Sequence, residues 1–126
     1  MVFSDTVLDH FQSPRNTGEI VGADTEAEDE NPVCGDRLHI WLRIDNGVVR
    51  ELRWQAQGCA PALAAASITS EMVRGMTLEE ARSIDRQAIA DALGGLPARK
   101  AHAAMLATST LRRALDQYQA RAGTKR

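Results

Sequence analysis

Two cysteines, an aspartate and a histidine are the side chains of this sequence that could together hold a metal ion. Cys34 and Asp36 lie two residues apart in a turn-forming stretch, and the glycine between them permits a sharp backbone path that would let both side chains face one centre. Cys59 comes where a helix is expected to begin, and helix N–H dipoles there favour the thiolate, the form that binds metal or attacks sulfur. His102 comes at the start of the last predicted helix, after a loop.

Each of these residues also has a purely structural explanation. The Cys34 segment could be an ordinary glycine turn with a buried thiol, and Cys59 could fill a small gap where a strand meets a helix. His102 sits about 180° around its helix from Leu111, away from the apolar stripe, and a lone histidine at a helix start is more often a surface residue than a ligand. Taken together, two thiolates, an imidazole and a carboxylate make a tetrahedral set for zinc, or for iron in a cluster. The spacing is not that of a zinc finger, so three chain segments would have to meet.

The other two histidines carry weaker signals. His39 lies on the strand face opposite Leu38 and Ile40, so we expect it to face solvent. His10 lies beside Phe11 in the first helix and is expected to be structural or at the surface. The sequence has no Gly-rich phosphate loop and no Ser–His–Asp pattern that would indicate another chemistry.

A β-hairpin is expected to position the first cysteine motif. Apolar residues alternate with others over residues 38–45, and this period of two predicts a strand with one face on a core. Asp45-Asn46-Gly47 is a strong hairpin signal, and a second strand is predicted over about 48–56. Before the hairpin, residues 19–30 are acidic and are predicted to be irregular, apart from a short strand near Ile20-Val21.

Helices are predicted on both sides of the hairpin from capping signals and apolar spacing. They cover residues 4–12, residues 58–74, a short segment after the capping box at Thr77, a segment capped by Asp85, and residues from about Lys100 to Ala120. The apolar face of the first helix is predicted to be Val7, Leu8 and Phe11, and that of the last to be Thr108, Leu111, Leu115 and Tyr118.

The order of these elements predicts an α+β fold, because strands come first and helices cluster after them. Such an order is typical of helices packed on one face of a small antiparallel sheet. The length of 126 residues fits a single domain, residues 1–126. Hydrophobic residues make up 44% and charged residues 25%, an ordinary globular composition that argues against disorder.

The net charge and the first residues of the chain argue against binding to nucleic acid or membranes and against secretion. The formal net charge is -2, the sequence pI is about 5.9, and there is no long basic run, which argues against nucleic acid and anionic membrane. The opening Met-Val-Phe-Ser-Asp lacks the parts of a signal peptide, and no apolar run is long enough to span a bilayer. We therefore expect a cytoplasmic protein whose two cysteines are free thiols.

Several short motifs, in the same order and spacing, resemble the IscU-type iron–sulfur cluster scaffold family, which is also found as the N-terminal domain of NifU. The resemblance runs along nearly the whole chain. The matching segments are Val7-Leu8-Asp9-His10-Phe11 with Pro14-Arg15-Asn16 and Gly18, then Pro32-Val33-Cys34-Gly35-Asp36, then Gly58-Cys59 through Ser67, then Gly75 through Ala81, and finally Leu96-Pro97, Lys100, His102, Met105 and Leu106.

The resemblance implies a fold of about three antiparallel strands packed against several helices, and a scaffold or binding protein rather than an enzyme. It implies that Cys34, Asp36, Cys59 and His102 bind a transient [2Fe–2S] cluster or Zn²⁺. It also implies a cysteine desulfurase that delivers sulfur, an iron donor, and apo-proteins that accept the cluster. The carboxylate is a harder ligand than a thiolate and would keep the cluster labile. Two alternatives stay open: a zinc-dependent, sulfurtransferase-like persulfide acceptor, and a non-catalytic zinc protein.

The sequence departs from the family's pattern at two places. The family's third cysteine immediately follows the histidine, and here that position is Ala103, which has no ligand atom. A cluster would therefore be held by two thiolates rather than three and should be weaker. The family's loop Leu-Pro-Pro-Val-Lys, which a dedicated heat-shock-type chaperone recognises, here reads Leu96-Pro97-Ala98-Arg99-Lys100, so binding of that chaperone is not expected.

Overall fold

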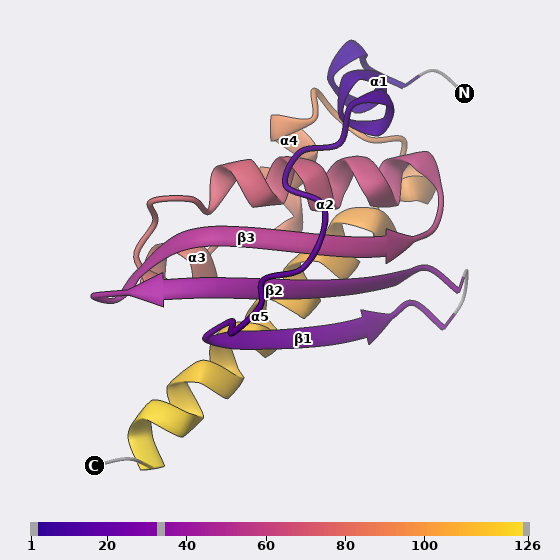
Figure 1. Ribbon diagram of the computed structural model, residues 1–126. Helices are drawn as coiled ribbons and strands as arrows, with labels where there is room; N and C mark the ends of the chain where they lie inside the picture. The colour runs from indigo at the N-terminus through magenta and orange to yellow at the C-terminus, as the bar shows by residue number, and fades with distance from the viewer. Residues whose placement is uncertain (1–2, 33–34, 125–126) are drawn as a thin grey trace.

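A three-stranded antiparallel sheet in the order β1-β2-β3 carries the long helices α2 and α5 on one face (Figure 1), in a computed structural model that describes residues 3–32 and 35–124. The strands are β1 (Thr25–Glu30), β2 (Arg37–Asp45) and β3 (Val48–Gln57). The helices are α1 (Asp5–Gln12), α2 (Ala60–Met72), α3 (Leu78–Arg82), α4 (Arg86–Ala92), the 3₁₀ turn η1 (Ala98–Lys100) and α5 (His102–Thr124). The predicted α+β class with about three strands is confirmed.

The predicted hairpin is present and is the centre of the sheet. Asn46 and Gly47 have φ angles of 53° and 72°, the two successive positive values that a tight type I′ turn requires. The inward-facing residues of β2 are almost fully buried, with Ile40 at 1% and Leu42 at 0% exposure. The period of two in the sequence therefore identified the core face of the strand correctly.

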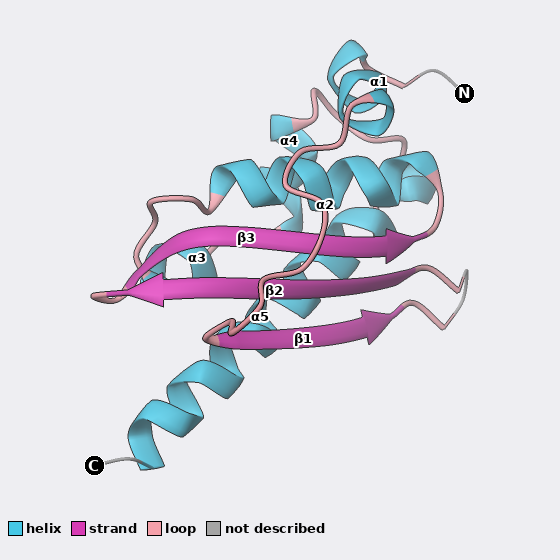
Figure 2. Cartoon of the chain, viewed as in Figure 1, coloured by secondary structure: helices cyan, strands magenta, loops and turns pink. Residues whose placement is uncertain are grey.

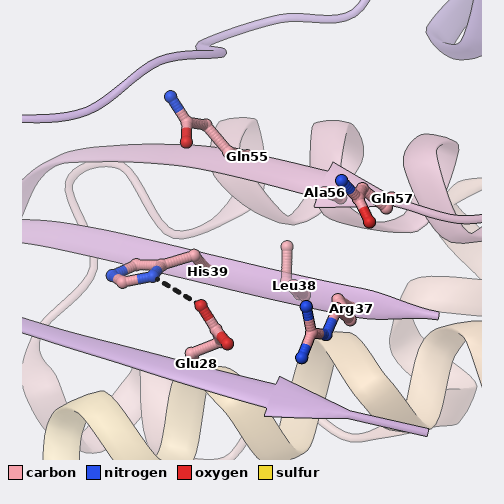
Figure 3. Close-up of a pocket in the computed structure, with 7 residues that line it drawn as sticks. All are labelled: Glu28, Arg37, Leu38, His39, Gln55, Ala56 and Gln57. Carbon is pink, nitrogen blue, oxygen red and sulfur yellow. Dashed lines mark hydrogen bonds and ion pairs between the residues drawn. The ribbon is translucent and has the colours of Figure 1, made fainter. Parts of the chain in front are cut away.

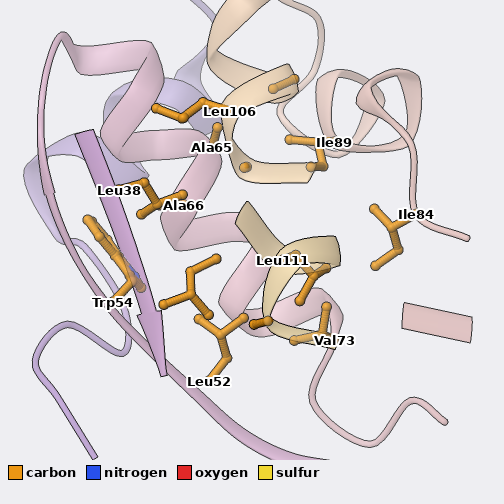
Figure 4. Packing of buried hydrophobic residues seen from close by; sticks show 14 of the residues in the cluster. Leu38, Leu52, Trp54, Ala65, Ala66, Val73, Ile84, Ile89, Leu106 and Leu111 are labelled. Carbon is orange, nitrogen blue, oxygen red and sulfur yellow. The ribbon is translucent and has the colours of Figure 1, made fainter. Parts of the chain in front are cut away.

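The core lies between the sheet and the helices (Figure 4). Ala64, Ala65 and Ala66 of α2 are buried, and their small side chains allow the helix to approach the sheet closely. From α5, Leu111 and Leu115 are fully buried, as the predicted stripe requires. No helix in the described ranges has both the length and the apolar character needed to cross a bilayer.

The helix starts follow the predicted caps, but the buried face of α1 differs from the prediction. The hydroxyl of Ser4 accepts from the Val7 N–H, and Thr77 and Asp85 cap α3 and α4 in the same way. Val7 is fully buried, whereas Leu8 and Phe11 are 40% and 42% exposed. The buried polar residue of this helix is His10, at 4% exposure. The face is thus rotated toward His10, because the imidazole finds polar partners on α2.

β1 is the element that the sequence did not predict. Residues 25–30 were expected to be irregular, with a short strand at Ile20-Val21; instead β1 pairs with β2 over its full length, and residues 20–21 lie in no strand. Four of the six residues of β1 are acidic, so only Thr25 and Ala27 are buried and the alternation is hard to recognise. Charges on an edge strand discourage pairing with other chains, which suits this position.

The chain between α1 and β1 crosses the outer face of the sheet (Figure 2). It first pairs with the free edge of β3, where the Gly18 N–H donates to the Trp54 carbonyl at 2.9 Å. It then reaches β1, and Asp24 donates its N–H to the Leu42 carbonyl. Ile20 and Trp41 are both buried although neither belongs to the cluster on the helix side, which shows that this segment covers part of the outer face.

Candidate metal centre

Asp36, Cys59 and His102 come from the ends of three elements that meet at one end of the sheet. Asp36 directly precedes β2, and the β2–β3 register pairs Arg37 with Gln57, so Asp36 is brought beside the residues that follow β3. Cys59 is the N-cap residue of α2. His102 is the first residue of α5. The structure therefore brings these three residues together from separate chain segments, as the sequence predicted.

One ligand atom from each of the three residues lies within 4.8 Å of the other two. Cys59 Sγ and His102 Nε2 are each 3.7 Å from Asp36 Oδ2. Ligand bonds of about 2.0–2.3 Å in tetrahedral geometry would place neighbouring ligand atoms roughly 3.3–3.8 Å apart. Both distances to Asp36 Oδ2 fall in that range, so Asp36 is spaced from Cys59 and His102 as neighbouring metal ligands are, and the third pair of ligand atoms lies within 4.8 Å.

His102 Nε2 is a buried nitrogen that is available to bind a metal ion. It is buried, yet it finds no hydrogen-bond partner among the described residues. Its one polar contact in the described parts of the chain is the Asp36 carboxylate at 3.7 Å, which is too long for a hydrogen bond, and a buried polar atom left without a hydrogen bond costs about 1–3 kcal/mol. A metal bound by this nitrogen would remove the deficit.

Gly58 makes room for the Asp36 carboxylate. A Cβ atom at position 58 would lie 2.7 Å from Asp36 Oδ1 and 2.9 Å from its Cγ. Asp36 is only 5% exposed and has little freedom to move aside. In the sequence this glycine is recognisable as part of a helix start and of a family motif, but its contact with Asp36 is a tertiary feature that the sequence does not reveal.

Cys34, the fourth predicted ligand, lies outside the described residues, and its part in the set stays a prediction. Described residues on either side of it are linked by backbone hydrogen bonds, since the Asn31 N–H donates to the Asp36 carbonyl at 2.8 Å and the Gly35 N–H donates to the Asn31 carbonyl at 2.7 Å. Gly35 has a φ of 76°, the left-handed conformation that the predicted sharp path required.

Ala103 is part of the apolar core, with 1% exposure. It therefore contributes packing where a ligand atom would be needed for a third thiolate. The helix surface that follows is open: Met105 is 48% exposed and, with His102, lines a groove of about 240 Å³. His102 can consequently be reached from this side of α5, whereas Asp36 and Cys59 do not line the groove.

His39 lies away from the metal centre, on the outer face of the sheet. Its Nδ1 is 3.1 Å from Glu28 Oε2, and its ring stacks on Trp41 with the ring centres 4.0 Å apart. Figure 3 shows the shallow cavity of about 330 Å³ beside it, where Arg37 and Gln57 also lie. The imidazole, predicted to face solvent, lies on the outer face but is only 26% exposed, because Trp41 and Glu28 contact it.

His10 has a structural role, one of the two that the sequence allowed. Its Nδ1 and the Ser67 hydroxyl form a hydrogen bond of 2.7 Å, and its Nε2 lies 3.5 Å from Glu71 Oε1. Burial lowers the pKa of His10 below its ordinary value, and the nearby Arg15 guanidinium lowers it further, against the opposing effect of Glu71 and Asp9. The neutral imidazole thus joins α1 to α2.

Comparison with known proteins gives consistent matches along the chain. A family model described as the NifU-like N terminal domain matches residues 2–125. Iron-sulfur cluster assembly scaffold protein IscU 1 of Archaeoglobus fulgidus is 46% identical over 117 residues, which cover 93% of this chain and 76% of that protein. The Haemophilus influenzae protein named iron-sulfur cluster assembly scaffold protein IscU is 34% identical over 127 residues, covering 98% of this chain and 100% of that one.

Solved structures with low sequence identity share the fold. The N-terminal NifU-like protein from Brucella abortus superposes with a TM-score of 0.80 at 18% identity, over 92% of this chain and 93% of that one. A scaffold from Fervidobacterium islandicum, described as putative and as belonging to the SUF system, gives a TM-score of 0.76 at 20% identity, over 90% of this chain and 96% of that one.

Proposed function

Because this chain belongs to the NifU-like N-terminal domain family, we propose that it is an iron–sulfur cluster assembly scaffold, built as one domain over residues 1–126. Its cargo is iron and sulfide, held at the metal centre and then passed to another protein. The observation that carries the proposal is the convergence of a carboxylate, a thiol and an imidazole within 4.8 Å, from Asp36, Cys59 and His102.

The proposed ligand set divides into soft and hard donors. Cys59, at the N-terminus of α2, and Cys34 supply thiolates, which iron–sulfur clusters prefer. Asp36 supplies a harder oxygen, and His102 a nitrogen that has no other hydrogen-bond partner among residues 3–32 and 35–124. With Ala103 in place of a third thiolate, a [2Fe–2S] cargo is held weakly, which favours release over storage.

The partners that this function needs are a cysteine desulfurase as sulfur source, an iron donor, and apo-proteins that accept the cluster. The groove lined by His102 and Met105 offers such proteins a surface next to one of the proposed ligands. We leave the dedicated chaperone out of the proposal, because the segment Leu96–Lys100 differs from the loop it recognises at two of five positions.

A second candidate is a zinc-dependent persulfide acceptor, favoured by the completeness of a four-donor set for Zn²⁺ without any third cysteine. In that reaction the Cys59 sulfur attacks the outer sulfur of a desulfurase persulfide. A new S–S bond forms at Cys59, the S–S bond of the donor breaks, and the donor cysteine leaves as a thiolate. Half-burial of Cys59 at a helix start is compatible with this attack.

Anaerobic reconstitution tests the scaffold proposal. The protein is incubated with iron and a sulfide source, desalted, and assayed for iron, acid-labile sulfide and zinc per chain, beside the visible absorption spectrum. We expect iron and sulfide in near-equal amounts with thiolate-to-iron bands, lost in Cys59→Ser and Cys34→Ser.

His39→Gln is the matched control, because it removes an imidazole outside the centre and should leave the cargo unchanged. Iron and sulfide that survive Cys59→Ser would contradict the scaffold proposal at this site. Zinc alone, with no sulfide after reconstitution, would favour the persulfide acceptor over the scaffold. If the protein then accelerated a desulfurase and Cys59→Ser abolished that acceleration, the persulfide acceptor would be supported.

A further inference from the structure

A basic pocket lies at the end of the sheet opposite the metal centre. It has a volume of about 290 Å³ and is formed where the first half of β3 meets the end of α2. Four arginines line it, and we call it the arginine pocket: Arg43, Arg50, Arg53 and Arg74. Glu51 is the one acidic residue among the described residues that line it, so the pocket carries a formal charge of about +3 in a chain whose net charge is -2.

The arginines of the pocket divide into two that are paired and two that are not. Arg53 Nε donates to Glu51 Oε2 at 2.6 Å, and Arg43 Nε lies 3.7 Å from Glu51 Oε1. The guanidinium groups of Arg50 and Arg74 form no hydrogen bond or ion pair with any residue in the described parts of the chain, and both residues are exposed. Two unpaired positive charges therefore border one cavity.

The backbone holds these two arginines in place. The β2–β3 ladder pairs Arg43 with Glu51 but Ile44 with Val49, so Arg50 is the extra residue of a β-bulge. Bulges turn a side chain out of the regular alternation and often occur next to functional sites. On the other side, the Gly75 N–H donates to the Val49 carbonyl at 2.8 Å, which ties the residue after Arg74 to the residue before Arg50.

The arginine pocket is separate from the metal centre. Gln57, beside the metal centre, lies six residues along β3 from Glu51, or roughly 20 Å at about 3.3 Å per residue. α2 spans about the same distance from Cys59 to its end near the pocket. Figure 1 shows the start and the end of α2 at opposite ends of β3. A ligand in the pocket would not touch Asp36, Cys59 or His102.

From these observations we propose that the arginine pocket binds a phosphoryl group, presented by a small phosphorylated molecule or by a phosphorylated residue of a partner protein. A dianion matches the two unpaired charges, and guanidinium groups bind phosphate oxygens in pairs through parallel N–H donors. Glu51 stays bound to Arg53 and positions the pocket wall, leaving Arg50 and Arg74 to contact the ligand.

Isothermal titration with two probes tests the proposal and separates the two sources. The full chain is titrated with inorganic pyrophosphate and with a short phosphoserine peptide, each at low salt of about 50 mM, where charge contacts are weakly screened. Saturable binding of either probe is expected. Tighter binding of pyrophosphate indicates a small molecule, and tighter binding of the phosphopeptide over its unphosphorylated form indicates a partner protein.

The double variant Arg50→Gln/Arg74→Gln should weaken binding of the better probe at least tenfold and reduce its salt dependence. Both residues are exposed, so the fold should tolerate the change. Arg113→Gln removes one positive charge from an exposed position on α5, as each of the single variants Arg50→Gln and Arg74→Gln does from the pocket, and should bind as the wild type does. The proposal is wrong if neither probe binds saturably up to about 10 mM, or if the double variant and Arg113→Gln bind equally.

Discussion

Substitution of Gly58 by alanine is the most direct test of how the metal centre is built. The new Cβ would lie 2.7 Å from Asp36 Oδ1, 2.9 Å from its Cγ and 3.2 Å from its Cβ. Ordinary contacts between such atoms begin at about 3.4 Å, so the carboxylate must retreat by roughly half an ångström or more. Asp36 Oδ2 is the atom that both Cys59 and His102 approach, so the retreat opens the ligand set.

The expected loss follows from the size of such indirect effects. Displacing a ligand by changing a residue behind it typically costs 10–100-fold in metal affinity, or about 1.4–2.8 kcal/mol. Overpacking at a buried site adds a fold destabilisation of about 1–3 kcal/mol, partly offset because alanine restricts the unfolded chain. Competition of the protein with a chromogenic chelator for Zn²⁺ measures the first quantity, and chemical denaturation of the metal-free protein measures the second.

A double-mutant cycle with Asp36→Ala identifies the route of the effect. If Gly58→Ala acts by displacing the carboxylate, its effect on zinc affinity should largely disappear once Asp36 is already alanine. Zinc affinity of Gly58→Ala within twofold of the wild type would refute the reasoning. So would an undiminished loss in the Asp36→Ala background, since that would place the effect elsewhere in the site.

Three further predictions concern the frame that carries the site. The pKa of His10 lies below its ordinary value of 6.5, so the unfolded chain binds a proton more readily than the folded protein does. The contribution of His10 to stability should therefore be complete above about pH 6.5 and fall as the pH drops toward the folded pKa. His10→Gln should flatten this part of a pH series of denaturation midpoints. Thr77→Ala removes the capping box of α3 and should cost about 1 kcal/mol by urea denaturation, whereas Gln117→Ala, at an exposed position of α5, should cost nothing measurable. Leu111→Ala should cost about 2–5 kcal/mol in the same assay, because a fully buried side chain of α5 leaves a cavity; a loss below about 1 kcal/mol would show that the core relaxes around it.

The parts of the fold that sequence predicts well are those with local signals. The hairpin has a period of two and a turn with two positive φ angles, and the helix starts have their own capping residues. β1 lacks such a signal, because its four acidic residues hide an alternation carried only by Thr25 and Ala27. The prediction of the buried face of α1 was wrong for a related reason, because the burial of His10 depends on Ser67, which is 57 residues away in the sequence.

The functional sites also contain features that depend on tertiary contacts and leave no local signal in the sequence. Residue types and positions suggested the candidate ligands, and the likeness to a family pointed to the same residues, but neither revealed the contact between Gly58 and Asp36. The arginine pocket was missed because its four arginines are spread between positions 43 and 74 and form no basic run. A β-bulge and the end of α2 bring them together, and both are properties of the folded chain.

The way in which the ligands are held bears on the choice between a cargo site and a purely structural zinc site. Asp36 lies just outside β2, Cys59 just outside α2, and His102 at the first residue of α5. Each of these elements packs into a core that extends from the sheet to both long helices, so the ligand positions are fixed by contacts that no metal makes. Structural zinc matters most where the core alone is too small to fold the chain. Here the fold already supplies the site, and a bound metal adds only the stability that its concentration and affinity allow. On such a frame the spacing of Asp36, Cys59 and His102 does not depend on a metal, which fits the proposed cargo site better than a structural zinc site.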